Sequence, residues 1–172
     1  MIGIAGSVFL TIGGGWIAAV LFSIGLIIIC ARGYNLYTGK IGYISKPKDL
    51  LKMLVYLIGN FIGVFLVSLT VVGAPAAALV TAKLAIPYWL LALKSIGCGF
   101  LMYLAVDIYK TRNSFIGIAT CIPAFILAGF EHSIADMFYV CCSGILNWQL
   151  VPFLVIIILG NAIGALLHKF IK

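Results

Sequence analysis

Charged residues are scarce in this chain. Only 9% of its 172 residues are charged and only four are acidic, whereas 65% are hydrophobic and the mean hydropathy is +1.26. A soluble domain of this size needs more charge to solvate its surface. The composition therefore excludes a soluble globular domain and predicts one all-α integral membrane domain over residues 1–172.

Three further features are missing from the sequence. No basic segment precedes Ile2 and no processing site follows, so we expect no cleavable signal peptide. The cysteines lack the spacing of a zinc site and lie within apolar runs, so we expect small core residues, no metal and no cofactor. The net charge of +7 lies in short loops, which indicates membrane topology rather than a nucleic-acid partner. The five cysteines are Cys30, Cys98, Cys121, Cys141 and Cys142.

Hydropathy predicts six membrane spans, separated by glycine turns and polar loops. A turn at Gly13-Gly14-Gly15 follows the first, short span, Ala76–Pro87 is expected to be a connecting stretch, and Ala74-Pro75 closes the third span. The apolar segments are Ile2–Ile12, Trp16–Ala31, Leu54–Gly73, Trp89–Val106, Phe115–Ala128 with Ile134–Ile145, and Leu150–Leu167.

The second and fifth spans are each expected to break within the membrane. Gly33-Tyr34-Asn35-Leu36 matches Gly129-Phe130-Glu131-His132, and Gly59-Asn60-Phe61-Ile62-Gly63 matches Gly160-Asn161-Ala162-Ile163-Gly164. Because each half has three spans, an odd number, the halves would cross in opposite directions and form a 3+3 inverted repeat, about 1–75 and 85–172. Two breaks that face each other indicate a pathway.

The distribution of lysine and arginine predicts how the chain is oriented in the membrane. Most fall on one side of the six-span arrangement, whereas Lys83 and Lys94 lie toward the other. The positive-inside rule then predicts a multi-pass protein of the cell (inner) membrane with both termini in the cytoplasm. The cytoplasmic set is Lys40, Lys46, Lys48, Lys52, Lys110, Arg112, Lys169 and Lys172.

Glu131, His132 and Asp136 are ionisable residues at membrane depth, where such groups are costly and usually functional. We interpret His132 as a pore residue, the alternative being a packing histidine bonded to a carbonyl. Glu131 is expected to cap the exposed amides of the broken helix. Asp136 could fix the imidazole tautomer or bind metal with His132, although a single HxxxD is a weak metal signal.

Other candidates surround the first break. Thr38 could bind a small anion or act as an ordinary cap. Arg32 and Lys40 could attract anions or extend to lipid headgroups, and Lys83 could be an anion lure or an interfacial anchor. Five apolar residues could form constrictions, although core or lipid-facing positions are the default for such side chains: Phe22, Leu26, Leu36, Tyr37 and Phe125.

The stretch Gly129–Phe138, GFEHSIADMF, resembles the hallmark motif of the formate/nitrite transporter family. Other stretches resemble the family in order, so that the similarity covers nearly the whole chain. They are Phe22–Leu26 through Leu36–Gly39, Ile58–Asn60, Leu104–Val106 and Leu159–Asn161.

The resemblance implies an aquaporin-like fold with broken helices 2 and 5, assembled as a homopentamer with one pore per subunit. It implies that His132 is the central pore histidine, that Thr38 is its partner, and that Lys83 is the vestibule lysine. Phe22 with Phe125, and Leu26 with Leu36 and Tyr37, would form the two constrictions.

The chain also departs from the family's pattern. It is unusually short, with a truncated first span, no amphipathic N-terminal helix and a reduced loop between spans three and four. Asp136 and Gly99 each stand where asparagine is usual, and Asn35 stands where an acid is common. The extra carboxylate of Asp136 could favour protonated His132 or repel anions.

The leading hypothesis is channel-like transport of a small monovalent anion and its conjugate acid, with proton relay at His132. Formate comes first, and nitrite, hydrosulfide, acetate and lactate are alternatives. A second hypothesis is a neutral-solute or water pore on the same fold. A membrane enzyme or metal protein built on Glu131, His132 and Asp136 lacks a second ligand cluster, and a purely structural subunit would not explain two facing breaks.

Overall fold

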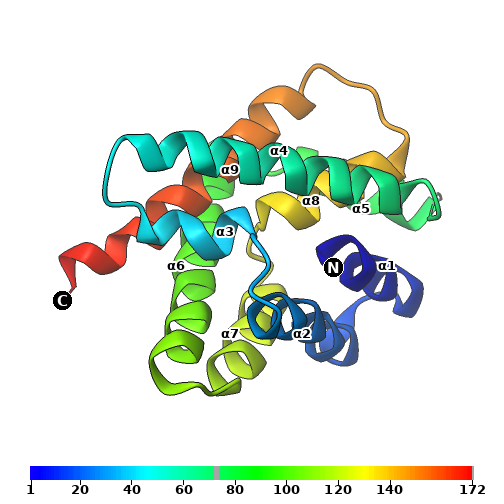
Figure 1. Cartoon of the computed structure of the whole chain (residues 1–172). Coiled ribbons are helices and arrows are strands. Elements are labelled where there is room, and N and C mark those ends of the chain that lie inside the picture. The colour runs from blue at the N-terminus through cyan, green and yellow to red at the C-terminus, as the bar shows by residue number, and fades with distance from the viewer. Residues whose placement is uncertain (72–73, 172) are drawn as a thin grey trace.

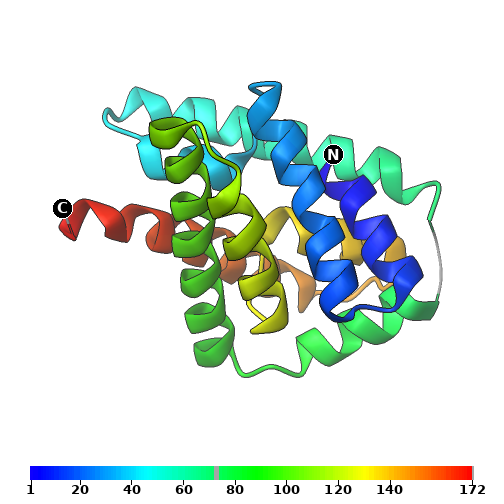
Figure 2. The ribbon, with the colours of Figure 1, turned by 90° about the horizontal axis from the view of Figure 1, so that it is seen from below.

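The computed structural model describes residues 1–71 and 74–171, and this part of the chain is all helical (Figure 1). Figure 2, turned by 90°, shows α1, α2, α6 and α7 crossing one side of the molecule, while the C-terminal end projects away from it. The elements are α1 (Ile2–Ile12), α2 (Gly15–Ala31), α3 (Tyr37–Lys40), η1 (Ile41–Tyr43), α4 (Lys48–Ser68), α5 (Ala74–Leu84), α6 (Tyr88–Arg112), α7 (Ile116–Leu127), α8 (Ser133–Ser143), α9 (Leu150–Leu166) and η2 (Leu167–Phe170).

Among residues 1–71 and 74–171, three helical segments are long and apolar enough to cross a membrane: Lys48–Ser68, Tyr88–Arg112 and Leu150–Phe170. The spans predicted from hydropathy overlap these three helices, but some of the predicted ends differ from the helix ends in the structure. The third was expected from Leu54, yet α4 begins six residues earlier at Lys48. The predicted end of this span, Val72 and Gly73, lies outside the described residues, as does Lys172 of the cytoplasmic set.

One expected connection was wrong. Ala74-Pro75 was predicted to close the third span and Ala76–Pro87 to be a connecting stretch, but Ala74–Leu84 forms the eleven-residue helix α5, with Lys83 in its last turn. Proline is tolerated in the first turn of a helix because the amides there have no intrahelical acceptor. This helix packs against α8 and brings Lys83 to it.

The tightest crossing joins α6 and α9. A Cβ atom on Gly99 would lie 2.1 Å from the carbonyl oxygen of Asn161, and one on Gly164 would lie 1.9 Å from that of Ile96. Small residues let membrane helices approach this closely. A larger side chain at position 99, such as asparagine, would not fit this crossing, where Asn161 is fully buried.

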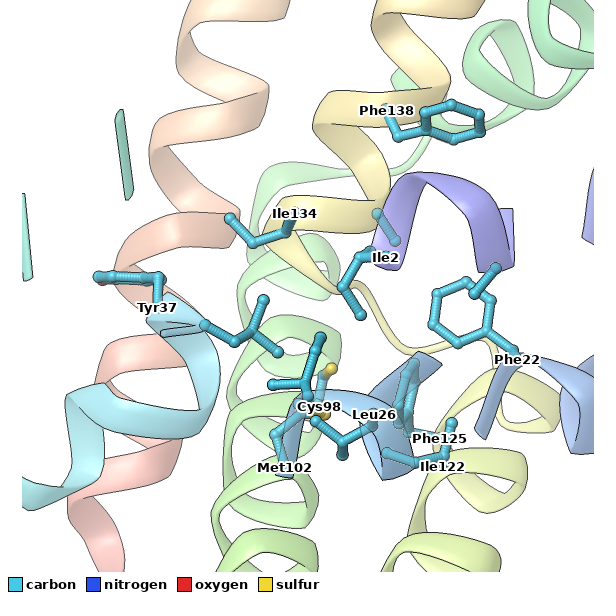
Figure 3. Close-up of a cluster of buried hydrophobic side chains, with 14 of the residues drawn as sticks. Ile2, Phe22, Leu26, Tyr37, Cys98, Met102, Ile122, Phe125, Ile134 and Phe138 are labelled. Atoms are coloured by element: carbon cyan, nitrogen blue, oxygen red, sulfur yellow. The ribbon is translucent and has the colours of Figure 1, made fainter. Parts of the chain in front are cut away.

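The core lies between the shorter helices and α6, and α4 adds only Met53 and Val64 to its main cluster. Figure 3 draws Phe22, Leu26 and Phe125 in one buried cluster with Cys98 and Met102 of α6. By contrast, only 11% of the most apolar window of α4 is buried. An apolar helix so exposed needs lipid or another protein chain against its outer face.

Candidate functional site

The segment 128–132, here called the second loop segment, separates α7 from α8. Gly129 has a φ of +65°, and the Gly129 and Phe130 amides donate to the carbonyls of Ile126 and Phe125 at 3.0 and 2.9 Å. This is the Schellman ending, which favours glycine because left-handed backbone strains other residues. The motif therefore ends α7 inside the protein.

The segment 32–36, here called the first loop segment, repeats this geometry after α2. Gly33 has a φ of +68°, and the Gly33 and Tyr34 amides donate to the carbonyls of Cys30 and Ile29 at 3.1 and 2.9 Å. In each motif, the glycine and the aromatic residue after it therefore end the preceding helix in the same way.

Two asparagines hold the loop segments. Asn60 of α4 accepts from the Tyr37 amide at 2.8 Å and donates to the Asn35 carbonyl at 2.9 Å. Asn161 of α9 accepts from the Ser133 amide at 2.8 Å and donates to the Glu131 carbonyl at 2.8 Å. These bonds satisfy backbone groups at the interrupted helices, which is required where no water reaches them.

The helix α3, which follows the first loop segment, meets the second loop segment through Thr38 and His132. Thr38 Oγ1 and His132 Nε2 are 2.9 Å apart, and both side chains are buried. His132 Nδ1 accepts the Ala135 amide at 3.2 Å and so caps α8. A nitrogen that accepts this bond carries no proton, so the proton of the neutral ring lies on Nε2 and is donated to Thr38.

Lys83 lies between two carboxylates. Its ammonium contacts Glu131 Oε2 and is 3.0 Å from Asp136 Oδ1. The side chains of Lys83, Glu131 and Asp136 are 15%, 3% and 2% exposed. The structure differs from one expectation here: His132 rather than Glu131 caps the helix, because Glu131 contacts a buried cation. Lys83, expected to be an anion lure or an interfacial anchor, has its charge compensated by the two carboxylates.

A cavity of about 150 Å³ opens on the Lys83 side. His132 and Asp136 are in its wall, and so are Phe22 and Phe125. The Phe125 ring is stacked 5.9 Å from the His132 ring. We call this the Lys83 cavity, and it gathers five of the predicted site residues.

A second cavity, of about 160 Å³, is lined by Leu26, Leu36, Lys40 and Lys110, among others. We call it the Lys40 cavity. Phe22 and Leu26 are four residues apart on α2, so they share a face of this helix and line one cavity each. Leu36 and Gly39, which lie close to Thr38 in sequence, line the Lys40 cavity. His132, the partner of Thr38, lines the Lys83 cavity, whereas the buried Thr38 side chain lines neither cavity.

Three predicted residues lie elsewhere. Tyr37 turns to α9, where its hydroxyl donates to the Ile158 carbonyl at 3.3 Å, and Figure 3 shows it away from Phe22 and Phe125. Asn35 is exposed and supports its loop through its carbonyl rather than its side chain. Arg32 is exposed at the end of α2.

Glu131, His132 and Asp136 do not converge on one point, because the carboxylates turn to Lys83 and His132 turns to Thr38. Within residues 1–71 and 74–171, no group of three or more histidine, cysteine, aspartate or glutamate side chains is placed to hold a metal ion.

The sequence did not reveal the bonds of Asn60 and Asn161 or the position of Lys110 in the wall of the Lys40 cavity. The repeated Gly-Asn motif was the available signal for the two asparagines.

Apolar membrane-length helices, together with a buried polar contact at the wall of a cavity, are typical of a membrane transport protein. The sequence profile of the formate/nitrite transporter family matches residues 1–171. The chain therefore belongs to this family, whose members are transport proteins rather than enzymes.

The individual proteins that this chain resembles are named as a transporter or as channels. The chain is 28% identical over 176 residues to the "Uncharacterized transporter YrhG" of Bacillus subtilis (strain 168), covering 86% of this chain and 66% of that protein. An "FNT family ion channel" superposes with a TM-score of 0.86 at 21% identity, covering 99% of this chain and 85% of the other. A "Pentameric formate channel with formate bound" superposes with a TM-score of 0.78 at 20% identity, covering 99% and 89%. The chain has the fold of these channels.

Proposed function

We propose that this chain carries a small monovalent anion and its conjugate acid across the membrane by a channel-like route, with formate as the first candidate. The observation that carries this proposal is the buried contact of Thr38 with His132, a histidine that lines the lysine-containing Lys83 cavity. The bound formate named for one structural neighbour supports the choice of formate. Nitrite, hydrosulfide, acetate and lactate remain alternatives.

The proposed architecture is a single transport domain of six spans in a 3+3 inverted repeat, with spans 2 and 5 interrupted at the two loop segments. The matching Schellman endings and the matching asparagine bonds support it, because each half builds its interruption from corresponding residues. The repeats would cover about 1–75 and 85–172.

The proposed orientation places the Lys40 cavity in the cytoplasmic half of a cell (inner) membrane protein, with both termini inside. Lys40 and Lys110 of the expected cytoplasmic set both line that cavity, which supports this orientation. The exposed apolar face of α4 supports contact with lipid or further copies, and the likeness to a channel described as pentameric supports a homopentamer.

In the proposed mechanism, a lysine attracts the anion into a cavity and His132 meets it at the polar contact. The Nε2 proton would be donated to the anion in place of Thr38. An anion is far more costly to move past Phe22, Phe125, Leu26 and Leu36 than its neutral acid is, because burial penalises charge. A relay by His132, direct or through water, would have to open the Ala135 bond to Nδ1 before that nitrogen could take a proton.

One observation favours the second candidate, a neutral-solute or water pore. Lys83 is compensated by two carboxylates, so this group gives the Lys83 cavity no excess positive charge. A pore of this kind would show flux of water or neutral solutes without any pH change.

The test is uptake into proteoliposomes of formate, nitrite, hydrosulfide, acetate and lactate, with the internal pH recorded. Native protein is compared with His132→Phe and with the control His168→Phe, whose ring stacks on Tyr103 outside the site. Joint entry of anion and proton that collapses in His132→Phe but not in His168→Phe supports the proposal. Equal flux in all three proteins removes His132 from the mechanism, and flux of neutral solutes alone selects the second candidate.

A further inference from the structure

The group formed by Lys83, Glu131 and Asp136 has one cation for two carboxylates. Their side chains are 15%, 3% and 2% exposed, so solvent does little to compensate an excess charge. If all three were ionised, the group would carry a net charge of −1 inside the protein and would repel the proposed anion. Because an uncompensated buried charge is strongly disfavoured, one carboxyl is expected to hold a proton.

The hydrogen bonds distinguish the two acids. Glu131 Oε2 lies against the Lys83 ammonium. Asp136 reaches the same ammonium through Oδ1, but its Oδ2 atom is buried and has no hydrogen-bond partner within the described chain. A buried carboxylate oxygen without a donor is unfavourable, whereas a protonated oxygen becomes a donor that a ligand can accept. Asp136 also lines the Lys83 cavity, where such a ligand would lie.

The surroundings leave Asp136 as the group that can change its protonation at little structural cost. In the described part of the chain, the titratable groups around it are Lys83 on α5, Glu131 and His132 on the second loop segment, Cys98 on α6 and Tyr139 on α8. His132 already uses Nδ1 as the cap of α8 and donates from Nε2 to Thr38. Protonating its ring would break the cap, whereas protonating Asp136 Oδ2 breaks no hydrogen bond.

We infer that Asp136 holds a proton in the resting protein and passes it to the anion that enters beside Lys83, so that His132 meets the conjugate acid and donates an Nε2 hydrogen bond to it rather than a proton. The inference rests on the proposed function. In this step the Asp136 O–H bond breaks, a new O–H bond forms on the anion, and the Asp136 carboxylate stays beside the Lys83 ammonium. The neutral acid moves on past Phe22 and Phe125, and water on the Lys83 side returns a proton to Asp136. One anion and one proton therefore cross together.

Infrared spectroscopy tests the resting proton without any transport assay. A protonated carboxyl has a carbonyl band distinct from those of a carboxylate. Native protein, Asp136→Asn, Glu131→Gln and the control Asp49→Asn are compared at neutral pH, since Asp49 lies outside the cavity at the start of α4. We expect the band in native and Asp49→Asn protein and its loss in Asp136→Asn. Absence of the band from native protein, or its loss only in Glu131→Gln, overturns the inference.

Uptake at different external pH values tests proton delivery. In Asp136→Asn we expect formate uptake to fall roughly 100-fold near neutral pH, in line with the lower range of general acid contributions. Uptake should approach the native rate at acidic pH, where the medium supplies neutral formic acid. Equal profiles in native and Asp136→Asn protein overturn the inference while the proposed function stands. If native protein carries no anion at any pH, the proposed function and this delivery step fail together, and the infrared result still decides the resting proton.

Discussion

Asn60 and Asn161 occupy corresponding places in the two halves of the chain, and each brackets one residue. Asn60 binds the carbonyl of Asn35 and the amide of Tyr37, while Asn161 binds the carbonyl of Glu131 and the amide of Ser133. The bracketed residues are Leu36 and His132. One half therefore presents an apolar side chain where the other presents an imidazole.

The two asparagines should differ in their contribution to stability. Asn161 is fully buried and also donates to the Ser95 carbonyl, so Asn161→Ala leaves several buried backbone groups unpaired. Asn60 is half-buried, and water can replace part of its bonding. We expect Asn161→Ala to lower the free energy of unfolding by about 2–4 kcal/mol and Asn60→Ala by about 1 kcal/mol.

Thermal unfolding in detergent, followed by circular dichroism, gives the comparison between the two variants. An equal loss of stability in both, or a greater loss in Asn60→Ala, would contradict the assigned roles.

Close helix packing supports a second prediction. In Gly99→Ala the new methyl group would meet the Asn161 backbone at 2.1 Å, and backbone atoms cannot move aside as a side chain can. We expect a loss of about 1–3 kcal/mol in the free energy of unfolding, with α9 displaced from α6. In the control Gly59→Ala, nothing lies within 4 Å of the new atom, and alanine favours a helix by up to about 1 kcal/mol.

The same unfolding assay compares these two variants. A Gly99→Ala protein as stable as the native chain would show that the crossing can open without cost.

Local signals account for the parts of the fold that could be predicted. Gly33 and Gly129 have positive φ and end helices by bonds within a few residues, so a glycine followed by an aromatic residue was sufficient to locate both loop segments. The helix at Ala74–Leu84 was missed because its sequence is short and begins with a proline in its first turn. Its packing depends on α8, far away in the sequence.

In the candidate site, too, local motifs predicted some residues, whereas contacts between distant parts of the chain could not be predicted. The roles of His132 and Thr38 were suggested by the loop motifs and by the family resemblance, and their contact spans 94 residues. The partners of Lys83 could not be predicted, since Glu131 is 48 residues away and no local pattern links them. The cap of α8 was assigned to Glu131 because the competition from a buried lysine is visible only in three dimensions.

Removal of Lys83 should reveal how much it compensates the carboxylates. Lys83→Met leaves Glu131 and Asp136 buried without a cation, and we expect the free energy of unfolding to fall by about 3 kcal/mol at neutral pH. Adding Asp136→Asn removes one of the stranded acids, so the double variant should recover part of this loss. The control is Lys94→Met, because Lys94 is expected on the same side of the membrane as Lys83. Its free energy of unfolding should differ from that of the native protein by no more than about 0.5 kcal/mol. A double variant less stable than Lys83→Met would contradict the charge argument.

Thr38 gives the most direct test of the polar contact. Thr38→Val keeps the shape of the side chain but removes the acceptor of the His132 Nε2 proton, leaving a buried donor unpaired. The free energy of unfolding should fall by about 1–3 kcal/mol, and anion uptake should fall because the imidazole is no longer held by Thr38. Thr38→Ser, which keeps the hydroxyl, should restore both properties in large part. The control Thr120→Val removes an exposed hydroxyl that bonds only within α7, so it should leave uptake unchanged. Uptake by Thr38→Val equal to that of Thr120→Val would mean that the contact has no part in transport.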